Sequence, residues 1–197
     1  MALLWKGLAC IAACGVLTAC AMGASPAPTA SPTVDGTESR GPAGLPLVIA
    51  VREDDFLVRW EIDAGQVRSS QALTLEATLT YEGDADVVEA FAGFHLIEFY
   101  LAQIDGPLVM DPVIESIGIC HDVRRGEPVV VPYAKSGGFA EPGDPNYPLM
   151  NDFLRDPDLH FPPGRWRITA VADFTLGCEQ GRQRIHIEAP GELIVED

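Results

Sequence analysis

Beyond residue 46, apolar and polar residues alternate along most of the chain. The alternation is clearest over residues 56–62, 73–81 and 166–174. A period of two is typical of a β-strand, because successive side chains of a strand point to opposite faces. These three segments therefore predict antiparallel strands, each with one buried face and one face that meets water.

Residues 94–104 differ, because large apolar side chains occupy both faces of the alternation. We interpret this segment as a central strand that is partly covered on its second side. Further strands are expected over residues 113–120, 129–133 and 185–195. In the last of these, Pro190-Gly191 indicates a bulge or a sheet edge.

Turn residues separate these segments at the spacing of a β-sandwich, for example in Glu82-Gly83-Asp84 and Asp105-Gly106-Pro107. The predicted fold class is all-β. We expect an antiparallel immunoglobulin-like β-sandwich of about eight strands, with one long loop rich in proline, glycine and aromatic residues. A small closed barrel is the alternative.

The first 46 residues lack this alternation and are expected to lie outside the folded domain. Lys6 precedes an apolar stretch over residues 7–17, which ends in Leu17-Thr18-Ala19-Cys20. This layout is that of a signal peptide, and its last four residues resemble the bacterial lipobox. The resemblance implies that residues 1–19 are removed and that Cys20 is lipidated. An uncleaved membrane helix is the alternative, but the uncharged stretch is shorter than the roughly 20 residues that span a bilayer.

Residues 20–46 are expected to form a disordered tether, because small, polar and proline residues offer little to bury. Residues 47–197 form the predicted β domain and carry 27 acidic and 11 basic side chains. This charge argues against nucleic acid as a partner and opposes close contact with anionic lipid. Acyl chains on Cys20 would make the lipid bilayer a partner and hold the protein on the extracytoplasmic face of a cell membrane. The sequence does not identify the envelope or extracellular partner.

Two cysteines, Cys120 and Cys178, remain in the predicted domain. Thiols oxidise outside the cytoplasm, so this pair is expected to form one disulfide. A metal-binding or catalytic role is the alternative, and neither cysteine belongs to a C-x-x-C motif.

The segment 132–164 interrupts the succession of short strands, and loops of this length are usually functional or disordered. Its aromatic residues argue against disorder, and residues 151–154 have the composition of one capped helical turn. We consider the segment a candidate binding loop, with the alternative that its aromatic side chains cover the end of the core. The candidate residues are Tyr133, Lys135, Phe139, Tyr147 and Phe153.

No residue spacing indicates catalysis, and the protein is expected not to be an enzyme. Ser136 lacks the G-x-S-x-G motif of a nucleophile elbow. His121 and Asp122 are neighbours in sequence and would point to opposite faces of a strand. No organic cofactor is implied.

Calcium is the metal that the acidic composition favours, since external domains meet millimolar calcium and hard cations bind clustered carboxylates. Neither candidate set follows the D-x-[DN]-x-[DN]-G loop, so the favoured interpretation is that these acids are solvated turn residues, with calcium as the alternative. Four scattered histidines give zinc or copper weaker support. The candidate calcium ligands are Asp152, Asp156 and Asp158, or Glu82, Asp84 and Asp86.

Residues 162–170, with the sequence PPGRWRITA, resemble the proline-glycine turn and aromatic-led strand near the end of many bacterial immunoglobulin-like domains. Domains of the intracellular proteinase-inhibitor type have a similar turn and strand. The resemblance implies the fold more than an activity, and a leader departs from the inhibitor pattern. We therefore expect a membrane-anchored lipoprotein with a non-enzymatic binding or envelope-associated role. The alternatives are a calcium-dependent or hydrolytic module and a proteinase-inhibitor-like domain.

Overall fold

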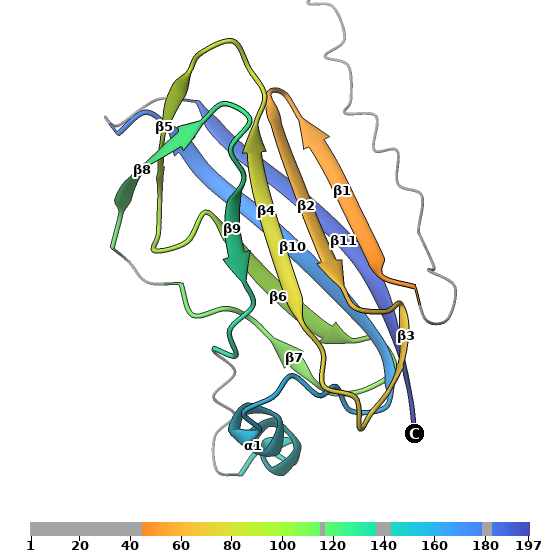
Figure 1. Cartoon of the computed structure of the whole chain (residues 1–197). Coiled ribbons are helices and arrows are strands. Elements are labelled where there is room, and N and C mark those ends of the chain that lie inside the picture. Colours follow the sequence, from red (N-terminus) through yellow and green to blue (C-terminus); the bar gives the residue numbers. More distant parts are fainter. Residues whose placement is uncertain (1–44, 115–116, 137–142, 179–182) are drawn as a thin grey trace, which may run out of the picture. The chain divides into compact units, whose positions relative to one another are not determined.

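The computed structural model describes residues 45–114, 117–136, 143–178 and 183–197. These residues form two β-sheets, one short helix and the loops that connect them (Figure 1). The all-β prediction is confirmed. The predicted leader, Cys20 and the predicted tether, apart from its last two residues, lie outside the described residues.

The first sheet is antiparallel throughout. Most of its inward positions are buried and its outward positions are half-buried or exposed, as the two-residue period of the sequence predicts. In spatial order its strands are β1 (Leu47–Glu53), β2 (Phe56–Ile62), β4 (Leu75–Tyr81) and β9 (Val129–Pro132).

The second sheet is built around a long antiparallel hairpin. Its members in chain order are β3 (Gln66–Arg68), β5 (Val87–Ala92), β6 (Ile97–Gln103), β7 (Val109–Met110), β8 (Ile119–Arg124), β10 (Gly164–Leu176) and β11 (Arg184–Glu196). Strands β10 and β11 form the hairpin, and β3 lies parallel to the end of β11. On the other side of β10 the sheet forks: β5 and then β8 follow one end, and β6 and then β7 follow the other.

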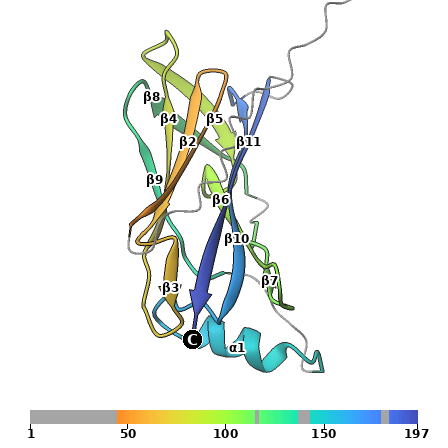
Figure 2. The ribbon, with the colours of Figure 1, turned by 90° about the vertical axis from the view of Figure 1, so that its right-hand side faces the viewer.

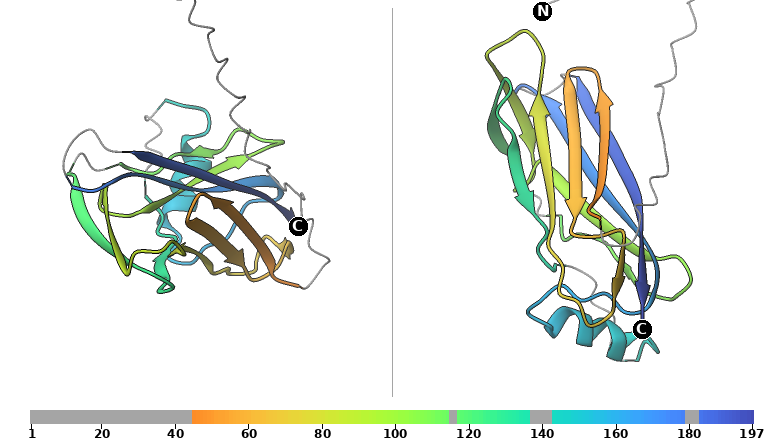
Figure 3. Two further views of the ribbon diagram at one scale, coloured as in Figure 1. Left: turned by 90° about the horizontal axis from the view of Figure 1, so that it is seen from above. Right: turned by 45° about the vertical axis from the view of Figure 1, so that its right-hand side comes forward.

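The two sheets lie face to face, as Figures 2 and 3 show, and one apolar core fills the space between them. Trp60 of β2 and Trp166 of β10 are completely buried in this core. The Trp60 Nε1 donates a hydrogen bond of 2.6 Å to the carbonyl of Ala189 in β11, which joins the sheets directly. A Cβ atom at Gly191 would lie 2.5 Å from the Trp60 ring, so the sheets can approach this closely only at a glycine.

Helix α1 (Tyr147–Arg155) covers one end of the core (Figure 1). Met150 and Phe153 are its buried residues, and the ring of Phe153 stacks on Trp166 with 6.5 Å between centroids. The predicted helical turn over residues 151–154 is therefore the second half of a longer helix. A proline in the first turn favours the earlier start, because it is preset for helical φ and needs no hydrogen-bond acceptor there.

Four strand predictions need correction. The predicted number of about eight is too low, since the described residues form eleven strands. The predicted strand over residues 113–120 is wrong, since β8 begins only at Ile119 and the described residues 113–114 and 117–118 are not in a strand. The predicted central strand 94–104 is shorter, because β6 begins at Ile97. The sequence predicts either a bulge or a sheet edge at Pro190-Gly191. In β11 the pairing with β10 runs through Pro190 without a bulge, so only the sheet edge remains.

Candidate functional site

Among the described residues, strand β6 has a neighbouring strand along its whole length on only one side. It pairs with β10 over its whole length, whereas β7 pairs only with Leu101 and Ala102. Because Met110 of β7 lies opposite Leu101, two further residues of pairing would place Pro112 opposite Phe99. At that position the N–H group of residue 112 would have to donate to the Phe99 carbonyl. Proline has no N–H, so the pairing stops and the chain leaves β6 after β7 (Figure 1).

A pocket of about 850 Å³ lies beside this free edge of β6. Its core-side lining is apolar and includes Phe99 of β6, Val131 of β9 and Tyr133 directly after β9. The rings of Phe99 and Tyr133 meet edge to face with 5.6 Å between centroids. Burial raises the pKa of the Tyr133 hydroxyl. The pocket therefore reaches the open side of the core, between the two sheets.

The rim of the pocket exposes large apolar side chains. Phe94, Val113 and Ile114 line the pocket and are 60%, 51% and 64% exposed. Scattered exposed apolar residues are ordinary in soluble proteins, but three that surround one pocket indicate a binding surface. We refer to Phe94, Val113 and Ile114 as the apolar rim.

The outer face of the second sheet gives the pocket an acidic wall, which we define as Glu98, Asp173 and Glu188. Burial raises the pKa of Glu98. Burial also raises the pKa of Tyr100, with smaller contributions from the acidic wall and Asp111. No lysine or arginine is among the described residues that line the pocket. The wall therefore favours a cationic ligand group.

The charges of the acidic wall are not equally available. Arg184 donates from Nε to Asp173 over 2.7 Å, and this hydrogen bond is the main reason why the pKa of Asp173 lies below its ordinary value. His186 Nε2 lies 3.1 Å from a carboxylate oxygen of Glu188. Glu98 forms no ion pair among the described residues. Glu98 is therefore the carboxylate best placed to attract a cation.

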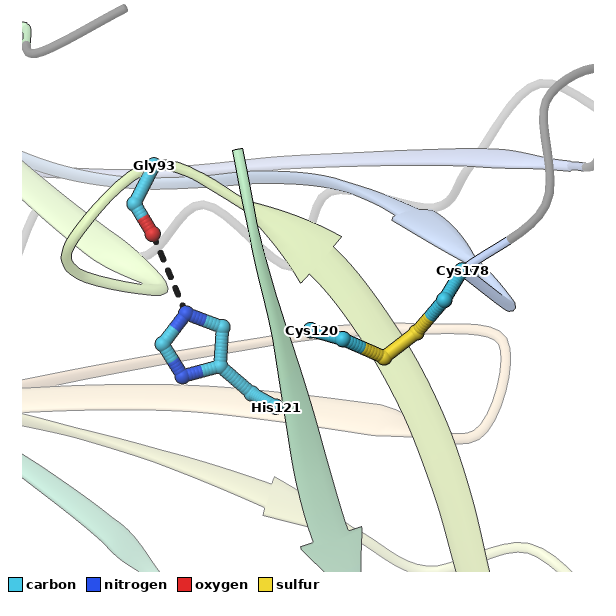
Figure 4. The surroundings of a disulfide bond; sticks show 4 residues. All are labelled: Gly93, Cys120, His121 and Cys178. Carbon is cyan, nitrogen blue, oxygen red and sulfur yellow. Dashed lines mark hydrogen bonds between the residues drawn. A yellow bond between two sulfur atoms is a disulfide. The ribbon is translucent and has the colours of Figure 1, made fainter. Parts of the chain in front are cut away.

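The two domain cysteines lie at disulfide distance, with 5.7 Å between the Cα atoms of Cys120 and Cys178, and Figure 4 shows the bond. The distance confirms the predicted pairing of the two cysteines. The neighbouring His121 places its Nε2 3.0 Å from the carbonyl oxygen of Gly93, which belongs to the loop at one end of the pocket. The disulfide and His121 thus hold β8 and this loop in place.

The carboxylate of Glu89 lies near the two sulfur atoms, so Glu89, Cys120 and Cys178 form a group of three potential metal ligands.

The predicted binding-loop residues do not form one surface. Lys135 lies 4.5 Å from the centre of the Phe153 ring. Its Nζ donates to the carbonyls of Phe153 and Asp156, at 2.8 and 2.9 Å, and to that of Asp158. Phe153 is buried in the core. Lys135 and Phe153 therefore fix the end of α1, and their side chains are not presented together to a partner.

The other predicted binding-loop residues are separated. Tyr133 lines the pocket, Tyr147 is the first residue of α1, and Phe139 lies outside the described residues. A binding role for the loop as a whole stays a prediction.

The predicted calcium ligands are not gathered at one point in the described part of the chain. Asp156 accepts hydrogen bonds from the Asp158 N–H, at 2.9 Å, and from His160 Nδ1, at 2.7 Å, and these bonds lower the pKa of Asp156. Asp152 lies within α1, where its carbonyl accepts from the Asp156 N–H. In the second set, Asp86 is paired with Arg125. Calcium binding stays untested.

Sequence reasoning missed the pocket, although a signal for it was present. The apolar residues Val113 and Ile114 lie within the predicted strand 113–120. Pro112, immediately before them, is the signal that the pairing of β7 with β6 ends. The signal can be interpreted only when Phe99 is known to lie opposite Pro112. Alternation places Glu98 on the second, partly covered face of the segment 94–104, and nothing in the sequence marks that face as a site.

Comparison of the chain with protein-family models, curated proteins and solved structures finds no match. Among the described residues, no helix has both the length and the apolar character needed to cross a membrane.

Proposed function

We propose that this protein is a membrane-anchored, extracytoplasmic binding module without catalytic activity, and that the pocket beside β6 is its binding site. The observation that carries the proposal is the pocket itself: about 850 Å³, apolar on its core side, and surrounded by the exposed apolar rim. Concave sites with apolar walls and a few polar groups are the usual form of ligand sites.

The chemistry of the pocket favours binding over catalysis. Ser136 and His95 both line it, but within the described residues no histidine is hydrogen-bonded to Ser136. Activation of a serine needs such a base within hydrogen-bond reach. His186 is held on the outer face of the sheet by two carboxylates, those of Asp173 and Glu188.

The sequence supports the anchor. The segment ending in Leu17-Thr18-Ala19-Cys20 has the order of a lipobox, and the following residues are suited to a tether. The expected disulfide Cys120–Cys178 suits an oxidising compartment. Acylation at Cys20 would hold the domain at the membrane surface, with its pocket free to meet a partner in the surrounding space.

For the fold, we propose an immunoglobulin-like β-sandwich. The support is the arrangement of two mainly antiparallel sheets around one core, between which the chain crosses repeatedly. The crossings lie between β2 and β3, β3 and β4, β4 and β5, β8 and β9, and β9 and β10. Crossings of this kind characterise Greek-key sandwiches. The small closed barrel has less support, because each described sheet keeps its own edge strands.

The anchor is tested by labelling cells that express the full chain with radioactive palmitate. Incorporation that disappears in Cys20→Ser is the expected result. A product that retains residues 1–19 by mass, or carries no label, would contradict the anchor.

The binding site is tested by comparing variants of the full chain for capture of partners from envelope extract. Val113→Asp places a charge in the apolar rim and is expected to lose the partners that the unmodified protein captures. Leu149→Asp is the matched control, because Leu149 is similarly exposed, at 49%, on α1 and does not line the pocket. Equal capture by both variants would exclude the pocket as the site.

A further inference from the structure

We infer that the pocket receives an extended segment of a partner protein, which joins the second sheet as an antiparallel strand beside β6 and carries lysine or arginine at alternate positions. This inference rests on the proposed function and adds the chemistry of the ligand and its mode of binding. Three features of the described residues support it: main-chain groups without a strand partner, two walls of different chemistry, and a negative charge without a cationic partner.

The first feature is the direction of the main-chain groups of β6. Gln103 N–H donates to the Leu108 carbonyl on the β7 side, and Ile104 N–H donates to the Arg165 carbonyl on the β10 side. Because these directions alternate along a strand, the N–H and C=O groups of Ile97 and Phe99 point to the β7 side. Among the described residues no strand pairs with them there. These groups are available to a ligand that hydrogen-bonds as a strand.

The second feature is that the two walls of the pocket have different chemistry. Ile97 and Phe99 are buried on the core side of β6, whereas Glu98 and Tyr100 are half-buried on its outer side. A strand added to β6 repeats this alternation, since paired residues share a face of the sheet. Its residues opposite Ile97 and Phe99 therefore point toward the core-side lining, and those between them point toward the acidic wall.

The third feature is charge, which selects the occupant. Glu98 has no cationic partner among the described residues, and the whole chain has a formal net charge of −16. A second copy of the same chain would bring two such charges together, which opposes association. A segment with apolar residues facing inward and cationic residues facing outward complements both walls.

The test uses the full chain in detergent and a capped seven-residue peptide in which four valines alternate with three lysines. Binding is measured by calorimetry. A peptide with the same residues in two blocks, four valines followed by three lysines, has the same charge and composition. We expect the alternating peptide to bind at least about tenfold more tightly, since the block peptide loses part of the apolar or cationic contacts.

Main-chain pairing is tested by methylating the peptide nitrogens. In an antiparallel pair, the residues that exchange hydrogen bonds with Ile97 and Phe99 lie directly opposite them, so they are the valines. Methylation of the valine nitrogens is expected to weaken binding by about tenfold or more, because it removes hydrogen bonds and leaves β6 groups unpaired. Methylation of the lysine nitrogens, which face away from β6, is expected to change affinity by less than about twofold.

The acidic wall is tested with Glu98→Gln, which is expected to weaken binding of the alternating peptide about threefold, as for one partly exposed ion pair. Glu76→Gln is the matched control, because Glu76 is a half-buried outward glutamate of β4 in the other sheet. We expect this control to bind the peptide unchanged.

Other results would overturn the inference. Equal loss from both sets of methylated peptides, or equal binding of the alternating and block peptides, would mean that binding needs only charge. If none of the peptides binds, strand addition is excluded, while the capture experiment with Val113→Asp still decides the proposed function. A full chain that is dimeric in solution, and whose dimer is strengthened by Glu98→Gln, would mean that a second copy occupies the edge.

Discussion

The two lateral sides of the domain are built in opposite ways. Where β1 and β2 meet β11, Trp60 reaches across the core to the Ala189 carbonyl, and Gly191 permits the close approach. Where β9 faces β6, a pocket remains, and part of the β6 edge is unpaired among the described residues. We call these the closed side and the open side.

The difference shows how one small domain provides both stability and a site. On the closed side, large buried side chains determine the distance between the sheets. On the open side, one proline ends a strand pair, and Cys120–Cys178 and the His121–Gly93 contact hold the neighbouring elements. Substitutions on the closed side should therefore change stability, and those at the open rim should change binding.

The largest effect is expected at the centre of the closed side. Trp60→Ala should reduce the free energy of unfolding by about 5 kcal/mol, because it leaves a large cavity and removes the bond to Ala189. Trp60→Phe should cost less, since it keeps most of the ring volume. Urea denaturation of the full chain measures both. A loss below about 2 kcal/mol for Trp60→Ala would show that the closed side is not the main source of stability.

The disulfide should have the next largest effect. Its closure spans 58 positions, and the chain-entropy relation gives a stabilisation of about 4 kcal/mol for a loop of this length. Replacing Cys120 and Cys178 together by serine should lower the melting temperature, and a reductant should then have no further effect. An unchanged melting temperature in the double variant would mean that β8 is held without the disulfide.

A smaller effect is expected from acid at Asp173 on the open side. The hydrogen bond from Arg184 holds the pKa of Asp173 below its ordinary value of 3.8 in the folded protein. This stabilisation is fully present above that value and is lost as the pH falls through the folded-state pKa. Asp173→Asn should cost a few tenths of a kcal/mol at neutral pH. Its melting temperature, measured from pH 6 to pH 2, should converge with that of the unmodified protein at the lowest pH, and parallel profiles would contradict this.

The smallest effect on stability is expected at the apolar rim. Phe94→Ala should change the free energy of unfolding by less than about 0.5 kcal/mol, because Phe94 is 60% exposed. The same substitution at the buried Phe56 should cost about 3–5 kcal/mol. Similar losses at the two positions, measured in urea, would show that the rim is part of the core.

The regular strands could be predicted from the sequence because the alternation of apolar and polar residues follows the alternation of buried and exposed positions. β2, β4 and β10 lie where their apolar residues recur at every second position. The length of α1 and the two-residue strand β7 could not be predicted from alternation, since both depend on tertiary contacts that form only in the fold. Phe153, for example, is buried because Phe161 and Trp166 are beside it.

The candidate site was less accessible to sequence reasoning. The pair Cys120–Cys178 could be predicted from the number of cysteines in the domain and the expected compartment. The open side depends on which residue lies opposite Pro112, and a register between β6 and β7 is fixed only by folding. Lys135 illustrates the same limit: in sequence it is a lone cation in a loop, whereas in the fold its hydrogen bonds satisfy carbonyls at the end of α1.

The unpaired edge of β6 also bears on solubility. Exposed strand edges are where β proteins join into insoluble aggregates, and charged residues on the edge oppose this. Glu98 and the formal charge of −16 provide that protection near neutral pH. Near the isoelectric point of about 4.4 the repulsion disappears while the edge persists. Precipitation there should therefore involve folded molecules stacked edge to edge.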